Sequence, residues 1–154
     1  MKILITSLTL ILLLLSSCAQ EETCRENKQV LFNIGFYTSE TTNALNIDSI
    51  TVFGINNNSI TPDSLYKNVK NINKIALPLN NSAEESIFVL NINGTHDTLN
   101  VQYSNKEYFI SYSCGMVITH HVDTVLSTSH LIKSYRILNR DINTTDVQHL
   151  QILL

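Results

Sequence analysis

Three residues with metal-binding side chains lie in one predicted strand at 116–125 (MVITHHVDTV): His120, His121 and Asp123. Because successive side chains of a strand point to opposite faces, only His121 and Asp123 share a face. Two ligands are too few for a zinc site, which takes four protein ligands or three plus water. The simpler interpretation is polar strand residues that face water, unless His130 adds a third ligand from across the next turn.

Hydroxyl and thiol nucleophiles gather at Ser111, Ser113 and Cys114. The chain has no Gly-x-Ser-x-Gly elbow, and no cysteine-protease signature surrounds Cys114. Its carboxylates are scattered without a calcium-loop pattern, and it has no Gly-rich loop to cradle phosphate. The sequence therefore predicts no catalytic residue and no cofactor.

The N-terminus carries the pattern of a secretory signal. Lys2 is followed by an apolar stretch at 3–15, which is short of the roughly 20 residues needed to span a membrane. Leu15-Ser16-Ser17-Cys18 comes next and resembles the lipobox of bacterial lipoproteins, in which the cysteine is acylated and the preceding peptide is removed. Two or more acyl chains hold a protein stably to a membrane. We expect a signal peptide at 1–17 and a lipid on Cys18; an ordinary signal peptide is the alternative.

The residues after Cys18 carry information on the membrane to which a lipoprotein is delivered. Ala19 does not resemble an inner-membrane retention signal, which would have Asp there. Glu21 and Glu22 resemble the surface-export signal of Bacteroidota lipoproteins, or they belong to a solvated tether without routing content. We expect a lipid-anchored protein of the bacterial cell envelope, in the outer membrane, on its periplasmic face or on the cell surface.

The other two cysteines, Cys24 and Cys114, form an even pair, which in an oxidising compartment predicts a disulfide. The bond would close a loop of about 90 residues, worth on the order of 4 kcal/mol in the chain-entropy model. It would tie the tether, residues 18–27, to the body of a single domain at 28–154. Two free buried thiols, or a reactive Cys114, are the alternatives.

The composition of the mature chain excludes one class of partner. Without residues 1–17 and their Lys2, 9 basic and 13 acidic residues remain, for a charge of −4. A nucleic-acid partner needs a clustered basic face, so we expect none.

Apolar residues recur with a period of two along most of the chain, which indicates β-strands. Asn93-Gly94 lies between two alternating runs, and this dipeptide favours the turn of a two-residue hairpin. The stretch 61–79 is ambiguous, because 61–72 could form a short helix; we favour an extended segment. The predicted fold is all-β: an antiparallel, immunoglobulin-like β-sandwich of eight or nine strands. The clear strands are 29–37, 48–55, 86–93, 97–103, 108–113, 116–125, 131–138 and 147–154.

Sugar binding by stacking on aromatic rings is a further possibility. The chain has no Trp. Core or cross-strand packing explains most of the candidate tyrosines more simply. These are Tyr37, Tyr103, Tyr108, Tyr112 and Tyr135.

Several segments in order resemble an uncharacterised family of short Bacteroidota lipoproteins, a domain of unknown function. They are DSITVFG at 48–54, LPLN at 77–80, DTL at 97–99 with Tyr103-Ser104, FIS at 109–111 running to Cys114-Gly115, and NTT at 143–145. The resemblance implies a β-rich anchored domain and transfers no catalytic or binding residue.

We therefore expect a non-catalytic binding or structural module. Its partners would be the membrane, through the N-terminal lipid, and an unknown envelope protein or glycan. The alternative is a small envelope hydrolase or metal-dependent enzyme that uses His121 and Asp123.

Overall fold

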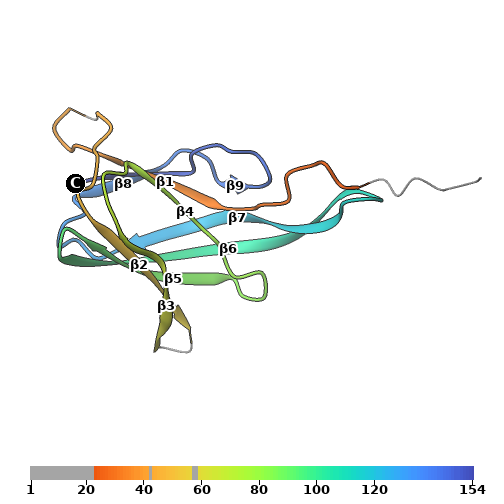
Figure 1. Ribbon diagram of the computed structural model, residues 1–154, viewed down its shortest axis with the longest axis horizontal. Helices are drawn as coiled ribbons and strands as arrows, with labels where there is room; N and C mark the ends of the chain where they lie inside the picture. Colours follow the sequence, from red (N-terminus) through yellow and green to blue (C-terminus); the bar gives the residue numbers. More distant parts are fainter. Residues whose placement is uncertain (1–22, 42, 57–58) are drawn as a thin grey trace, which may run out of the picture.

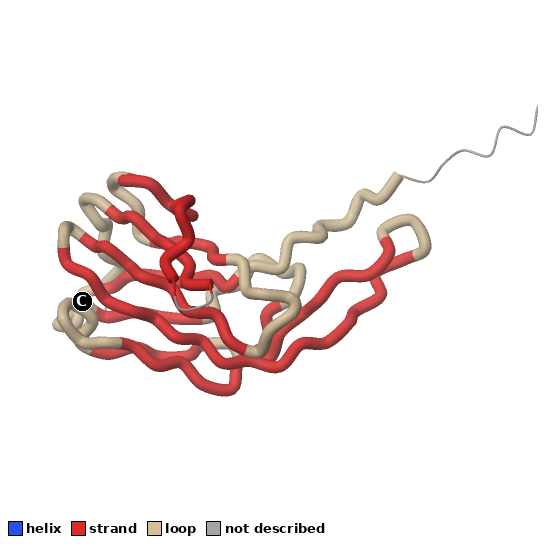
Figure 2. Tube along the Cα trace, turned by 90° about the horizontal axis from the view of Figure 1, so that it is seen from below, coloured by secondary structure: helices blue, strands red, loops and turns tan. Residues whose placement is uncertain are grey.

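The computed structural model describes residues 23–41, 43–56 and 59–154. The expected signal peptide, Cys18 and the start of the tether lie outside this part of the chain. The described residues form strands joined by loops, without a helix (Figure 2). Accordingly, this part contains no helix long and apolar enough to cross a membrane. The all-β prediction is confirmed.

The strands form two sheets, with the orders β4-β1-β10-β8 and β3-β2-β5-β6-β7-β9 (Figure 1). All strand pairs are antiparallel except β1 with β10. Buried side chains from both sheets meet in one core, as predicted for an antiparallel sandwich. The strands are β1 (Phe32–Tyr37), β2 (Ile50–Asn56), β3 (Ser59–Val69), β4 (Lys74–Leu77), β5 (Glu85–Ile92), β6 (Thr95–Ser111), β7 (Gly115–Ser127), β8 (Ser134–Ile137), β9 (Asp141–Ile142) and β10 (Leu150–Leu153).

Ten strands are described where eight or nine were predicted. The predicted strands 97–103 and 108–113 fall on one long strand, β6, which ends at Ser111, because the polar residues between them continue the backbone ladder with β7. The short strand β9 had no sequence signal. The arrangement of four strands facing six also differs from the four-facing-three arrangement of an immunoglobulin constant domain.

The ambiguous stretch 61–79 is extended, as favoured, and supplies β3 and β4. The pairing of β3 with β2 contains three register shifts. Asn68 and Asn71 then adopt φ angles of 48° and 56°. Asn tolerates this left-handed region better than most residues, so the chain can turn here from one sheet to the other.

A β-bulge interrupts β7 at Asp123. The register between β6 and β7 shifts by one residue between Gln102 and Tyr103, and Asp123 is the extra residue. Because one extra residue reverses the alternation of side chains, Val122 and Val125 both reach the core although they are three residues apart. The bulge therefore lets β7 bury side chains on both sides of Asp123, although the strand alternation is interrupted there.

A buried carboxylate fixes the chain where it passes from β7 to β8. Asp97, near the start of β6, is 2% exposed. Its Oδ1 accepts hydrogen bonds from Thr128 Oγ1 at 2.6 Å and from the N–H of His130 at 2.8 Å. Its Oδ2 accepts from the N–H groups of Leu131 and Ile132 at 2.7 and 3.0 Å. One side chain thus satisfies three consecutive backbone donors of the crossover loop.

These hydrogen bonds also set the charge state of Asp97. Burial alone raises the pKa of its carboxyl group, because it disfavours the ionised form. The hydrogen bonds from Thr128 and the loop backbone favour the ionised form and outweigh burial. They lower the pKa of Asp97 from 3.8 to about 2.

The predicted hairpin at Asn93-Gly94 is confirmed. Ile92 pairs with Thr95, and the two residues between them have φ angles of 50° and 88°. Positive φ at both central positions is the requirement that this dipeptide meets. Asn93 also accepts a hydrogen bond from the N–H of Ser49 at 2.9 Å, and donates its own N–H to the Ser49 carbonyl at 2.9 Å. The turn is therefore joined to the entry of β2.

We predict that Gly94→Val destabilises the protein by roughly 1 kcal/mol or more, because a β-branched residue tolerates positive φ badly. Apart from its two chain neighbours, no residue lies within 4 Å of a Cβ added at Gly94, so the expected cost comes from the backbone conformation and not from a clash of the Cβ. Gly94→Asn should cost less. Melting temperatures measure both; equal values for both variants and wild type would contradict a register-setting role for this turn.

We predict that Asp97→Asn lowers the free energy of unfolding by about 2 to 4 kcal/mol, because an amide cannot accept at both former oxygens. Asp123→Asn is the matched control, since Asp123 is an exposed bulge residue. Denaturant titrations compare the two. An equal, small effect at both positions would contradict the role of Asp97.

The same carboxylate predicts a pH dependence. When folding lowers the pKa of a carboxyl group, the group stabilises the folded protein at a pH above its unfolded-state pKa. This stabilisation is lost as the pH falls towards the folded-state pKa. For a pKa of 3.8 lowered to about 2, the contribution is roughly 2 kcal/mol. The stability difference between wild type and Asp97→Asn should therefore shrink between about pH 4 and pH 2. A constant difference over this range would argue against the lowered pKa.

Candidate functional site

The second half of β6 and the first half of β7 extend beyond the sandwich as a two-stranded ribbon (Figures 1 and 2). Along β6 the inward side chains are buried as far as Tyr103, whereas residues 106–109 are exposed. Backbone pairing between β6 and β7, and not core packing, holds the ribbon together; the pairing continues through Phe109 opposite Met116. It carries its tip away from the core and towards the N-terminal tether.

A tight turn at 111–115 forms the tip of the ribbon. Ser111 Oγ accepts a hydrogen bond from the N–H of Cys114 at 3.1 Å and lies 3.2 Å from Ser113 Oγ. Gly115 has φ 74°, a conformation that favours glycine. The hydroxyls considered as nucleophiles are therefore part of the turn.

The structure joins Cys24 and Cys114 in a disulfide, with an S–S distance of 2.00 Å and a Cα–Cα distance of 4.7 Å. Cys114 is 4% exposed, and as a disulfide half it is not a free thiol. A second contact lies a few residues along the tether, where Asn27 Nδ2 donates to the Thr144 carbonyl at 2.8 Å. The tether is thus fixed to the tip of the ribbon and to the loop after β9.

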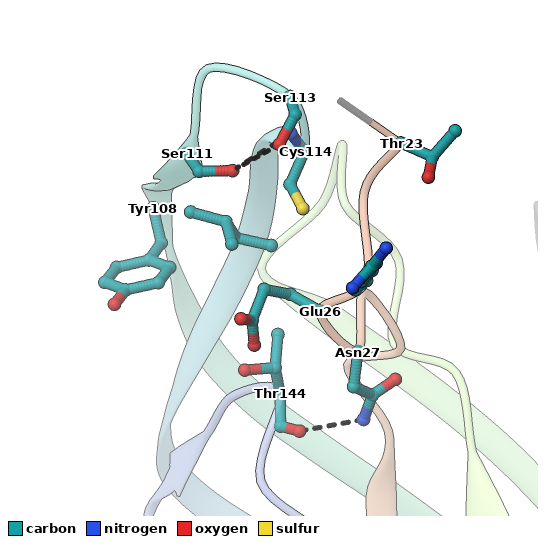
Figure 3. Close-up of a pocket in the computed structure, with 10 residues that line it drawn as sticks. Thr23, Glu26, Asn27, Tyr108, Ser111, Ser113, Cys114 and Thr144 are labelled. Atoms are coloured by element: carbon teal, nitrogen blue, oxygen red, sulfur yellow. Dashed lines mark hydrogen bonds between the residues drawn. The ribbon is translucent and has the colours of Figure 1, made fainter. Parts of the chain in front are cut away.

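A hollow of about 800 Å³ opens between the tether and the ribbon (Figure 3). Glu26 and Asn27 line it from the tether, Tyr108 and Ser111 from the ribbon, and Thr144 from the loop after β9. The lining offers carboxylate, amide and hydroxyl groups to a polar ligand. Among these residues there is no nucleophile with a histidine base beside it.

Large apolar side chains are exposed together at the tip. Phe109 and Met116 are direct cross-strand neighbours and are 50% and 53% exposed. Tyr112, in the turn, is fully exposed, and its ring packs edge-to-face on Phe109 with centroids 5.4 Å apart. We call these three residues the tip cluster. A contiguous apolar group far from the core indicates an interaction site, whereas single exposed apolar residues are ordinary.

The tyrosines proposed for sugar stacking fall into two groups. Tyr37, Tyr103 and Tyr135 are buried or half-buried in the sandwich, as packing predicts. Tyr108 and Tyr112 are exposed on the ribbon, which the packing interpretation did not anticipate.

The structure does not pair His121 with Asp123. His121 Nδ1 lies 2.6 Å from Asp141 Oδ1 of β9, and both side chains are more than half exposed. Asp123 occupies the bulge, where its carbonyl accepts from Arg140 at 2.8 Å. His130, the possible third ligand, lies 3.1 Å from Asp97 instead. Over the described ranges, no three His, Cys, Asp or Glu side chains gather as a metal site would require.

His120 was predicted to face water, and this is wrong: it is buried, at 3% exposed. Its Nδ1 lies 2.7 Å from Asn105 Oδ1, and its ring packs edge-to-face on Tyr103 at 5.1 Å. Burial lowers the pKa of His120, so the neutral form is favoured. The Tyr103 hydroxyl in turn lies 2.7 Å from Ser86 Oγ and accepts from the Asn80 N–H at 2.9 Å. This network holds the loop between β4 and β5 against the sheet.

Residues 49–154 match the model of one protein family, described as "Family of unknown function (DUF6452)". The chain belongs to the DUF6452 family. No curated protein and no solved structure matches it. The DUF6452 match includes the ribbon and Cys114, but it begins after Cys24 and after β1.

We predict that Cys24→Ser/Cys114→Ser lowers the free energy of unfolding by roughly 2 to 4 kcal/mol, because the bond closes a long loop. A reducing agent should lower the melting temperature of the wild type and leave that of the double variant unchanged. Two titratable thiols in exported, unreduced wild-type protein would contradict the bond.

Proposed function

We propose that this member of the DUF6452 family is a lipid-anchored protein of the bacterial cell envelope whose β-sandwich is a non-catalytic binding or structural module. The observation that carries the proposal is the Cys24–Cys114 disulfide, whose Cys24 lies six residues after Cys18. Disulfides persist in oxidising compartments outside the cytosol, which agrees with the secretory pattern at 1–17. The bond also attaches the anchored end of the chain firmly to the folded body.

The roles of the candidate catalytic groups support a non-catalytic module. The Cys114 sulfur is bonded in the disulfide, and the Ser111 hydroxyl accepts a hydrogen bond within the tip turn. His120 bonds to an asparagine, and Asp97 bonds to backbone N–H groups. Each of these groups has a structural partner, and none is placed as a nucleophile beside a base. A metal-dependent enzyme based on His121 and Asp123 gains no support, because His121 pairs with Asp141.

The position of the tether supports an orientation for the anchored protein. The tether joins the molecule at the ribbon end, whereas the C-terminus lies at the other end (Figure 1). A chain anchored through Cys18 would hold the ribbon beside the membrane. It would present the loops at the far end to the surroundings, where an envelope protein or a glycan could bind.

We predict that Cys18→Ala removes the lipid and releases the protein from the membrane fraction. The measurements are cell fractionation and labelling with a palmitate analogue. Because this variant could keep its uncleaved signal peptide, a second chain with residues 19–154 behind a cleavable, non-lipoprotein signal is the matched control. Membrane retention of that second chain, or absence of the label from wild type, would contradict the lipid anchor.

A further inference from the structure

We propose that the tip cluster inserts into the interface of the membrane that holds the chain, so that the protein contacts lipid at the ribbon as well as through its acyl chains. This inference rests on the lipid anchor at Cys18 proposed above. It adds a second membrane contact, made by Phe109, Tyr112 and Met116, which orients the domain.

The covalent path from the lipid to the tip is short. Cys24 follows Cys18 by six residues, and six extended residues span at most roughly 20 Å. The disulfide joins Cys24 directly to Cys114 in the tip turn. Tyr112 is two residues from Cys114. With 4.7 Å between the Cα atoms of the disulfide and two further residues, the backbone at Tyr112 lies at most roughly 30 Å from Cys18. The tip cluster is therefore held close enough to the anchor to reach the bilayer surface.

The chemistry of the cluster fits a lipid interface. Phe109 and Met116 supply apolar surface, and Tyr112 supplies a ring with a polar hydroxyl. Tyrosine is enriched where one end of a side chain is apolar and the other is wet, as at the boundary between acyl chains and headgroups. Directly behind the cluster the surface becomes polar, at Glu107 and at the lining of the hollow described above. Tyr108, between Glu107 and Phe109, is also exposed at 53%, but the charge of Glu107 and the polar lining of the hollow favour shallow insertion.

A tryptophan reporter tests the proposal, because the chain contains no Trp. Tyr112 is fully exposed, so Tyr112→Trp changes a side chain that supports no buried packing. Leu126→Trp is the matched control, on the same strand pair but towards the far end of β7, at 51% exposure in the wild type. Both lipidated, full-length variants are reconstituted into phosphatidylcholine vesicles, with and without brominated acyl chains, and separated by flotation.

We expect both variants to float with the vesicles. The emission of Tyr112→Trp should shift to the blue and be quenched by the brominated chains, whereas Leu126→Trp should keep a solvent-exposed spectrum. Adding Cys24→Ser and Cys114→Ser to Tyr112→Trp should reduce the quenching, since the tip is then no longer joined to the tether.

The outcomes separate the two proposals. Protein that floats with no quenching of Tyr112→Trp would overturn the membrane contact and leave the lipid anchor in place. Protein that does not float would overturn both. A photo-crosslinker at position 112 that forms its main adduct in intact cells with a protein, instead of with lipid, would also overturn the membrane contact.

Discussion

The hydrogen bonds of the Asp97 carboxylate are the interaction on which the connection from β7 to β8, between the two sheets, depends. Asp97 belongs to the six-stranded sheet, and the N–H groups that it binds, at 130–132, lead into β8 of the four-stranded sheet. Ile132, one of these donors, is itself a core residue at 2% exposure. A loop that changes layers must leave several backbone donors without a ladder partner, and a buried donor without a partner costs about as much as a lost hydrogen bond. Here one ionised side chain satisfies three of them, so the crossover can be short and still place Ile132 in the core.

Local patterns were enough to predict most of the strands and one turn. Alternation identified the cores of β1, β2, β5 and β7, and Asn93-Gly94 fixed a register because its two residues must adopt positive φ. These features depend on residues adjacent in the chain. Three features escaped prediction because they depend on residues far apart: the bulge at Asp123, the burial of His120 and the role of Asp97. The spacing of Val122 and Val125, three residues apart within an alternating strand, was the available signal for the bulge.

In the candidate site, too, local sequence patterns predicted some features, and those that depend on distant residues escaped prediction. Counting cysteines was enough to propose the pair Cys24 and Cys114, because exclusion of Cys18 leaves only two. The sequence also predicted that the bond ties the tether to the domain, but not that Cys114 lies at the tip of a projecting ribbon, since YFISYS at 108–113 has the composition of a buried strand. Whether Phe109 and Tyr112 lie inside or outside depends on where the opposite sheet ends. That sheet does not extend over the ribbon, so residues of core type remain exposed.

The parallel pairing of β1 with β10 has a consequence for the order in which the chain can fold. Ile34 pairs with Leu150, across 116 residues of sequence (150 minus 34), and β1 lies between β4 and β10 in the four-stranded sheet. Contacts between such distant residues form late and slow folding. In the export proposed above the N-terminus crosses first, so β1 emerges first and β10 last, and the four-stranded sheet cannot close until translocation is nearly complete. During that interval the edges of β1, with its buried Phe32, Ile34 and Phe36, are open to pairing with other chains.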